Sequence, residues 1–287
     1  MRALIQGYVG NDRLIDNLYR TLIDLKYEVE FTKEFDQLDP FKSDIMVMTG
    51  FHKMNPYCSD VMKSQKKLCL VMDAGYVQRG DYCQVGLYKL NYLNPFDCRD
   101  DRWVRLGKQI KSQPDSSIRN RILVCGQIPG DAQHPFKSRR SITEYYTELY
   151  ARLKKVTQRE VHFRPHPGYR DPDLGAVYDE VLSPDTPLED EIRQSWCVVT
   201  YNSGVGIESL LEGVPVFIDT SRFGDQLPLY HTLANYDIRR IEDPWFPRDA
   251  DRENFFHRLA YSQWTPEEWL DPQWLQMFQS ILKKGLL

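Results

Sequence analysis

Residues 198–218 constrain the fold of this chain more than any other segment. They read as a short apolar strand, a polar glycine-rich turn, an amphipathic helix that ends at Gly213, and a second apolar strand. That order is typical of a parallel sheet with a covering helix. The turn brings backbone amides to the start of the helix, where a negatively charged group is stabilised. We therefore expect an anion site formed by Asn202, Ser203, Gly204 and Gly206.

A second strand in the same half of the chain also ends in polar residues. Residues 161–164 are followed by a histidine between two prolines, so the exit carries Arg164 and His166 on a restricted backbone. The carboxyl ends of parallel strands meet at one edge of a sheet, where ligands of open α/β folds bind. The two exits suggest a nucleotide-binding crevice. Gly126 and Gln127, after a strand at 121–125, could approach the same ligand through the backbone.

The whole chain alternates strand and helix patterns in two consecutive halves. The polar, proline-containing stretch 111–117 is the best linker candidate. We expect an α/β fold of two Rossmann-like domains facing each other across a cleft, at 1–115 and 116–262, with a C-terminal helical tail at 263–287 that packs back on the body. Strands are expected near 3–7, 29–31, 44–48, 68–72, 121–127, 161–164, 198–200 and 216–218, and helices near 14–25, 59–65, 141–157, 188–194 and 207–212.

Composition and charge limit which cell compartment and which partners we expect. The chain has 287 residues, a net charge of -4 and 41% hydrophobic residues, which is ordinary for a globular protein. No stretch is long and apolar enough to span a membrane or to act as a signal peptide, and the six cysteines show no CxxC spacing, so we expect free thiols in the cytoplasm. The acidic balance disfavours a broad grip on nucleic acid. One expected basic helix favours nucleic-acid binding; it carries Arg99, Arg102, Arg105, Lys108 and Lys111.

Three motifs together resemble one enzyme family. They are the Arg-Pro-His-Pro exit at 164–167, the Asn-Ser turn with the glycines that follow it, and an acidic-x-Gly motif at Asp73. The chain resembles GT-B glycosyltransferases that build capsule and lipopolysaccharide from CMP-activated acidic sugars, of the CMP-Kdo or CMP-sialic acid type, mainly over residues 121–220. The resemblance implies that Asp73 is the general base, that His166 contacts the donor phosphate, and that the serine turn holds phosphate or nucleotide. A UDP-linked donor stays open.

Simpler structural roles compete with these assignments. Asp73 follows a buried strand and could instead cap the turn at Gly75, in which case Asp81 would be the next candidate base. Glu208 could bond ribose hydroxyls, as the resemblance implies, or stabilise the start of its helix. Arg79 and Asp81 could pair as a loop clasp. We interpret His162 as a core residue.

Other chemistries have little support in the sequence. It contains no HExxH, DxD metal pair, GxSxG or GxxxxGK[ST] motif, and the glycines after the first strand lack the dinucleotide fingerprint spacing. We expect no metal and no cofactor beyond the nucleotide-sugar donor. The favoured acceptor is a hydroxyl group of a surface glycan, and a hydroxymethylated base of phage DNA comes second. A nucleotide-sugar epimerase of the same fold and a non-catalytic nucleotide-binding module are the alternatives.

Overall fold

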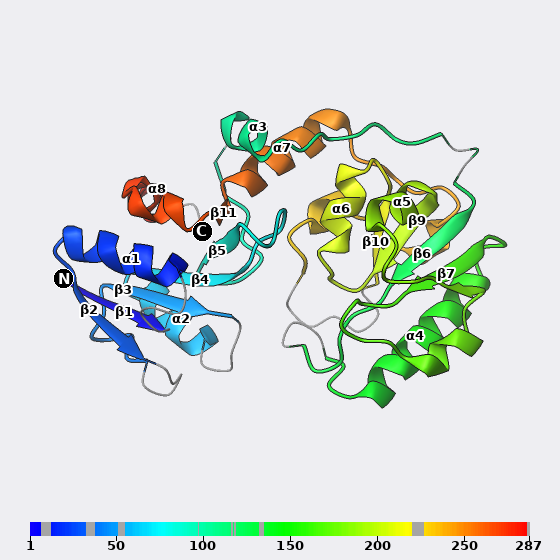
Figure 1. Cartoon of the computed structure of the whole chain (residues 1–287), viewed down its shortest axis with the longest axis horizontal. Helices are drawn as coiled ribbons and strands as arrows, with labels where there is room; N and C mark the ends of the chain where they lie inside the picture. The colour runs from blue at the N-terminus through cyan, green and yellow to red at the C-terminus, as the bar shows by residue number, and fades with distance from the viewer. Residues whose placement is uncertain are drawn as a thin grey trace. The chain divides into compact units, whose positions relative to one another are not determined.

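The computed structural model describes residues 1–6, 13–32, 38–50, 55–96, 98–115, 117, 119–131, 135–219 and 227–285. The chain forms two units, each with its own sheet and core (Figure 1). Unit 1 comprises Met1–Leu106 and Phe256–Leu287, and unit 2 comprises Gly107–Phe255. The C-terminal segment therefore belongs to unit 1, although it follows unit 2 in the sequence.

Unit 1 contains a six-stranded mixed sheet. Its strand order is β11-β5-β4-β3-β1-β2, in which β1 to β4 pair in parallel while β5 and β11 pair antiparallel. The parallel strands lie where the sequence predicts strands, whereas the two antiparallel strands were not predicted. The strands are β1 (Arg2–Gln6), β2 (Glu28–Thr32), β3 (Ile45–Thr49), β4 (Leu68–Ala74), β5 (Cys83–Leu87) and β11 (Gln263–Trp264).

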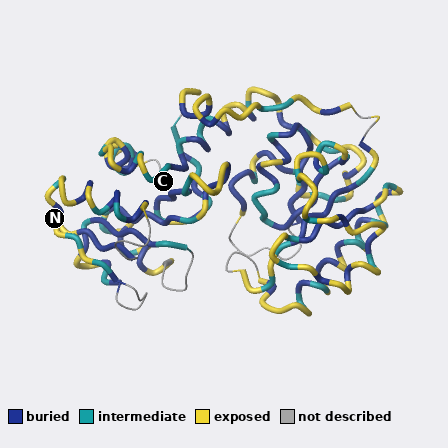
Figure 2. The backbone as a smooth tube through the Cα atoms, viewed as in Figure 1, coloured by how far each residue is buried: buried dark blue, intermediate teal, exposed yellow. Residues whose placement is uncertain are grey.

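Helices cover both faces of this sheet because successive strand side chains point to opposite faces. Ile5, Val47 and Leu70 pack in one cluster with α1 and the C-terminal tryptophans, while Met46 and Val71 pack on the other face with α2. The helices are α1 (Arg13–Asp24), α2 (Asn55–Ser64), α3 (Asp101–Leu106), η6 (Glu267–Leu270) and α8 (Gln273–Lys284). Figure 2 shows the buried strands between these layers.

A buried arginine ties the returning C-terminal segment into unit 1. Arg102 on α3 is 8% exposed and donates hydrogen bonds to the carbonyls of Ala260 and Gln263 and to the Glu268 carboxylate. Its guanidinium also lies 4.2 Å from the centre of the Trp264 ring. The charge is thus buried with enough acceptors to offset its desolvation.

Unit 2 contains a five-stranded parallel sheet with strand order β10-β9-β6-β7-β8. The α4 side chains pack on one face, and residues of α5 and α6 pack on the other. The strands are β6 (Arg121–Cys125), β7 (Glu160–Arg164), β8 (Glu180–Val181), β9 (Ser195–Thr200) and β10 (Val216–Ile218). The helices are α4 (Arg139–Lys154), η3 (Pro172–Ala176), α5 (Leu188–Arg193), α6 (Val205–Leu211), η4 (His231–Leu233), η5 (Ile238–Arg240) and α7 (Asp249–Ala260), whose last residues pass into unit 1.

The register of the unit 2 sheet brings three strand exits to one edge. Cys125 at the end of β6 pairs with Arg164 at the end of β7, and Val124 pairs with Val199 near the end of β9. The predicted strands and helices of this half are all present. β6, β7 and β9 are neighbours in the sheet. The residues that follow them are therefore at the same carboxyl edge, where ligands of open α/β sheets bind.

No helix in the described ranges combines the length and the apolar character needed to cross a membrane. All six cysteines fall within those ranges and none forms a disulfide. Burial raises the pKa of the Cys125 thiol to about 12, so it packs in the core as a neutral side chain.

Candidate functional site

Asp73 lies in a pocket at the carboxyl edge of the unit 1 sheet. The residue is the penultimate member of β4, half-buried, and its Oδ1 accepts the N–H of Ala74 at 2.7 Å. The pocket has a volume of about 350 Å³. It is lined by Leu14, Thr49, Gly50, Met72, Asp73, Ala74, Gly80, Asp81, Tyr82, Cys83 and Pro266. The pocket can therefore hold a small polar molecule against a carboxylate.

The glycine of the acidic-x-Gly motif has a packing role. A Cβ at Gly75 would lie 2.6 Å from the carbonyl oxygen of Tyr82, and the Gly75 N–H donates to that same oxygen at 2.9 Å. The close approach of β4 and β5 thus requires glycine at this position. It also fixes the backbone two residues after Asp73, so the motif positions the carboxylate whatever its chemical role.

The fallback base, Asp81, lines the same pocket as Asp73. The clasp expected between Asp81 and Arg79 is absent from the ion pairs of the described residues. Arg79 donates through Nε to the carbonyl of Gly75 at 3.2 Å instead. Two carboxylates consequently share one pocket, and one of them stands at the end of a buried strand.

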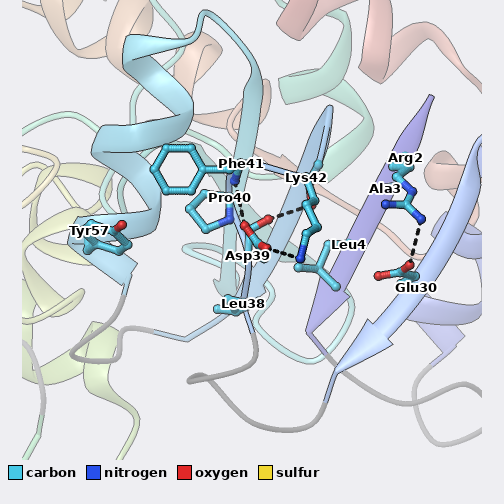
Figure 3. Close-up of a pocket in the computed structure, with 11 residues that line it drawn as sticks. Arg2, Ala3, Leu4, Glu30, Leu38, Asp39, Pro40, Phe41, Lys42 and Tyr57 are labelled. Atoms are coloured by element: carbon cyan, nitrogen blue, oxygen red, sulfur yellow. Dashed lines mark hydrogen bonds and ion pairs between the residues drawn. The ribbon is translucent and has the colours of Figure 1, made fainter.

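A larger pocket of about 470 Å³ lies at the opposite edge of the unit 1 sheet (Figure 3). Arg2 and Ala3 at the start of β1 contribute to it, as do residues that precede β3. Its charged side chains already pair with each other: Arg2 bonds Glu30 at 3.7 Å and Lys42 bonds Asp39 at 2.9 Å. Because active sites of open α/β sheets lie at the carboxyl edge, the smaller Asp73 pocket is the better candidate.

Arg164 bonds a nearby loop of unit 2, and its predicted contact with a phosphate stays a prediction. Its side chain is buried and holds the loop at 183–186. Nη1 donates to the Ser183 carbonyl at 3.2 Å and the Thr186 hydroxyl at 3.0 Å, and Nη2 donates to the Pro184 and Thr186 carbonyls at 2.9 and 2.8 Å. Four of its five N–H groups are used by this loop. These hydrogen bonds tie the loop at 183–186 to the end of β7.

His166 is held in one tautomer at the exit of β7. Its Nδ1 accepts the backbone N–H of Gly168 at 2.9 Å, so the neutral ring carries its proton on Nε2. Gly126, just after β6, lies close to the neighbouring strand β7. An added Cβ at Gly126 would be 2.8 Å from the Phe163 ring and 3.4 Å from the backbone nitrogen of His166. The Gly126 N–H itself donates to the Arg164 carbonyl. The close approach to β7 therefore requires glycine at position 126, and the Gly126 amide is used inside the sheet.

A side-chain hydrogen bond links the exits of β6 and β9. The Gln127 amide donates through Nε2 to Oδ1 of Asn202 at 2.6 Å, and the Asn202 N–H is 3.5 Å from Oε1 of Gln127. Beside this pair, the Ser203 hydroxyl accepts the N–H of Val205 at 3.3 Å. A hydroxyl oxygen that accepts in this way keeps its own hydrogen for donation. The predicted polar residues of the two exits thus form one donor-rich edge.

The remaining predicted residues of the turn are Gly204, Gly206 and Glu208. The Gly206 N–H bonds the Ser203 carbonyl at 3.1 Å, and the Gly204 carbonyl accepts from Ile207 at 2.9 Å. Glu208 lies in the first turn of α6 and is exposed, and its role toward ribose stays a prediction. Sequence reasoning missed Tyr230, whose hydroxyl donates to the Ser203 carbonyl at 2.8 Å. No local sequence pattern links two residues that stand 27 positions apart.

Two further predictions concern the five basic residues of one helix and the burial of His162. The basic residues proposed to share one helix do not do so, since α3 contains only Arg102 and Arg105 of the five and ends before Gly107, which has φ +64°. Arg102 is buried, and Lys111 pairs with Glu212 at 2.7 Å. His162 is buried as expected. Among the residues that the structure describes, no group of three or more His, Cys, Asp or Glu side chains could hold a metal ion.

Comparison with solved structures identifies the fold. Thermosulfurimonas dismutans KpsC, described as a β-Kdo 2,7 transferase, superposes with a TM-score of 0.56 at 15% identity and covers 98% of this chain and 99% of its own. The β-Kdo 2,4 transferase of the same protein gives a TM-score of 0.51 at 14% identity, over 88% and 89%. No protein-family model and no curated protein sequence matches the chain. The chain has the GT-B fold.

Proposed function

We propose that this protein is a metal-independent glycosyltransferase that moves a sugar from a CMP- or UDP-linked donor to a hydroxyl acceptor. The observation that carries the proposal is which residues lie at the carboxyl edges of the two sheets in a GT-B fold. One edge presents a carboxylate in a pocket, and the other presents clustered hydrogen-bond donors. A transferase needs both a proton acceptor for the incoming hydroxyl and donors for the departing phosphate.

On this proposal, unit 2 binds the donor. The Nε2–H of His166, the Ser203 hydroxyl and the Gly204 N–H of the Asn202 turn supply hydrogen bonds to phosphate or nucleotide oxygens. Such charge-assisted bonds are stronger than bonds between neutral groups. Gln127 holds Asn202 in place. Arg164 contributes indirectly, because it fixes the loop at 183–186 next to the same exits. Glu208 is the candidate partner of the ribose hydroxyls.

Unit 1 then supplies the base. The acceptor oxygen attacks the anomeric carbon of the donor, the bond from that carbon to the phosphate oxygen breaks, and the acceptor proton passes to Asp73. The electron pair of the broken bond stays on the nucleotide, where the unit 2 donors stabilise the added negative charge. Asp73 needs no metal for this step, since a carboxylate accepts the proton directly.

A surface glycan is the favoured acceptor. The basic residues that favour DNA do not share one helix: Arg102 and Arg105 lie on the six-residue α3, where Arg102 is buried, and Lys111 forms an ion pair with Glu212. A hydroxymethylated base keeps its place as the second acceptor to assay. The remaining alternatives are an epimerase, which would convert donor without acceptor, and a module that binds nucleotide without turnover.

The first experiment is a thermal-shift screen against CMP, UDP, GDP and their sugars, followed by transfer assays with the donor that binds. A ligand at 100 times its dissociation constant stabilises the folded protein by about 2.7 kcal/mol, which such a screen detects. We expect one cytidine or uridine nucleotide to raise the Tm, and sugar transfer only when acceptor is present. Donor conversion without acceptor would favour the epimerase. A shift with no reaction would favour the module.

A further inference from the structure

Tyr230 is buried against the turn that carries Asn202 and Ser203. It is 1% exposed, and its hydroxyl donates to the Ser203 carbonyl at 2.8 Å. Its ring occupies the space beside Gly206, where an added Cβ would lie 2.0 Å from Cζ and 2.4 Å from the hydroxyl oxygen. Burial raises the pKa of Tyr230 well above its ordinary value, so the hydroxyl stays protonated and remains a donor. Gly206 is therefore glycine to admit this ring.

The hydrogen bond from Tyr230 sets the direction of a backbone amide. The Ser203 carbonyl accepts both the Tyr230 hydroxyl and the Gly206 N–H. In a planar trans peptide, the C=O and the following N–H point in opposite directions. Fixing the Ser203 carbonyl toward Tyr230 thus directs the Gly204 N–H to the other side of the turn.

Tyr230 is itself anchored to the sheet. Five residues later, Asn235 pairs in parallel with Phe217 of β10, donating its N–H to the Val216 carbonyl and accepting from Ile218, both at 2.8 Å. Tyr230 is the residue before η4, which continues to that bridge. The segment that contains Tyr230 is therefore bonded to β10 through Asn235, and to the turn after β9 through the Tyr230 hydroxyl.

We propose that Tyr230 is a positioning residue that orients the Ser203 turn, and with it the Gly204 N–H, for an oxyanion of a nucleotide phosphate. The inference rests on the proposed function of unit 2 and adds a residue to it. Tyr230 does not need to touch the ligand. It acts by holding one peptide plane in a fixed orientation, so that the amide is already oriented when the phosphate arrives.

The test compares two tyrosines that each donate to a backbone carbonyl. Tyr230→Phe keeps the ring on Gly206 and removes only the hydroxyl. Tyr236→Phe is the matched control, because the Tyr236 hydroxyl donates to the His231 carbonyl at 2.7 Å in the same segment. We expect Tyr230→Phe to weaken binding of the nucleotide found in the screen by about three- to tenfold and to raise KM for the donor, whereas Tyr236→Phe leaves both unchanged.

A second measurement does not depend on a nucleotide. Amide hydrogen exchange of the ligand-free protein should be faster around Ser203 to Gly206 in Tyr230→Phe and unchanged there in Tyr236→Phe. Wild-type exchange and wild-type affinity in Tyr230→Phe would overturn the positioning role. So would equal losses of affinity in both variants. If the wild-type protein binds no nucleotide but the exchange result holds, the proposed function fails and the structural part of this inference stands.

Discussion

The two units use similar α/β layers but different sheets, and the difference follows their predicted tasks. Unit 2 has five parallel strands, and its candidate residues come from three exits of one edge. Unit 1 adds the antiparallel strands β5 beside β4 and β11 beside β5, so Asp73 lies in a hairpin whose second strand contributes Cys83 to the pocket. A parallel edge gathers many donors for an extended ligand. A hairpin at a strand end places the carboxylates of Asp73 and Asp81 in one small pocket.

Each unit also closes a non-local segment with one buried arginine. Arg102 bonds the carbonyls of Ala260 and Gln263 in unit 1, and Arg252 on α7 is 1% exposed and donates to the carbonyls of Leu210 and Lys111 in unit 2. Their ionic partners differ. Glu268 beside Arg102 is partly buried, whereas the Asp249 side chain beside Arg252 is 81% exposed. Both arginines donate to backbone carbonyls of residues far away in the sequence.

The largest stability effects should come from these two arginines. Arg102→Met and Arg252→Met each leave buried carbonyls without donors, so we expect each to lower the free energy of unfolding by about 3–5 kcal/mol. Scanning calorimetry should show the loss in the unit that carries the substitution. Arg105→Met and Arg248→Met are the controls, since both side chains are exposed and should leave the Tm nearly unchanged. Equal losses in variants and controls would contradict the clasp role.

A smaller effect is expected from Arg164. Arg164→Met removes four hydrogen bonds to the loop at 183–186 and should cost about 1–3 kcal/mol of unfolding free energy. The control is Arg170→Met, whose exposed side chain bonds Asp185 of the same loop at 3.2 Å. Thermal melts and nucleotide titrations decide between the two roles. An unchanged Tm with lost affinity would return Arg164 to the donor phosphate.

The smallest effect should follow removal of divalent metal. In the proposed mechanism, Asp73 and the unit 2 donors supply proton transfer and charge stabilisation without a cation, so turnover should persist in excess EDTA. The measurement is the initial rate of transfer with and without chelator. Loss of turnover that magnesium or manganese restores would show that the departing phosphate requires a cation.

The fold was largely readable from the sequence because both units repeat strong local patterns. The patterns at 68–72, 161–164 and 198–200 predict strands, and the polar residues at their exits predict Asp73, His166 and Ser203 as edge residues. The antiparallel β5 was not recognised, because Gly86 interrupts its short alternation and is required where a Cβ would lie 1.8 Å from the Lys89 carbonyl.

The roles of single side chains were harder to predict than the strands. The hydrogen bonds of Arg164 to the loop at 183–186 could not be predicted, because the sequence gives no sign that this loop returns to Arg164. Tyr230 was missed because its partner, Ser203, precedes it by a helix and a strand. The sequence also predicted that the C-terminal helices pack on the body, without indicating that Arg102 would bind their segment. Long-range contacts of this kind depend on tertiary structure and not on local pattern.

The most direct test of the division between the units is a crossed pair of substitutions, Asp73→Asn and His166→Ala, each measured for nucleotide affinity by calorimetry and for kcat. We expect Asp73→Asn to lower kcat by about 10²–10⁴-fold with nucleotide affinity near wild type, and Asp81→Asn, the matched control in the same pocket, to lower kcat far less. His166→Ala should weaken nucleotide binding by about tenfold or more. A loss of nucleotide affinity in Asp73→Asn equal to that in His166→Ala, or near wild-type kcat in Asp73→Asn, would contradict the assignment of base and donor site to separate units.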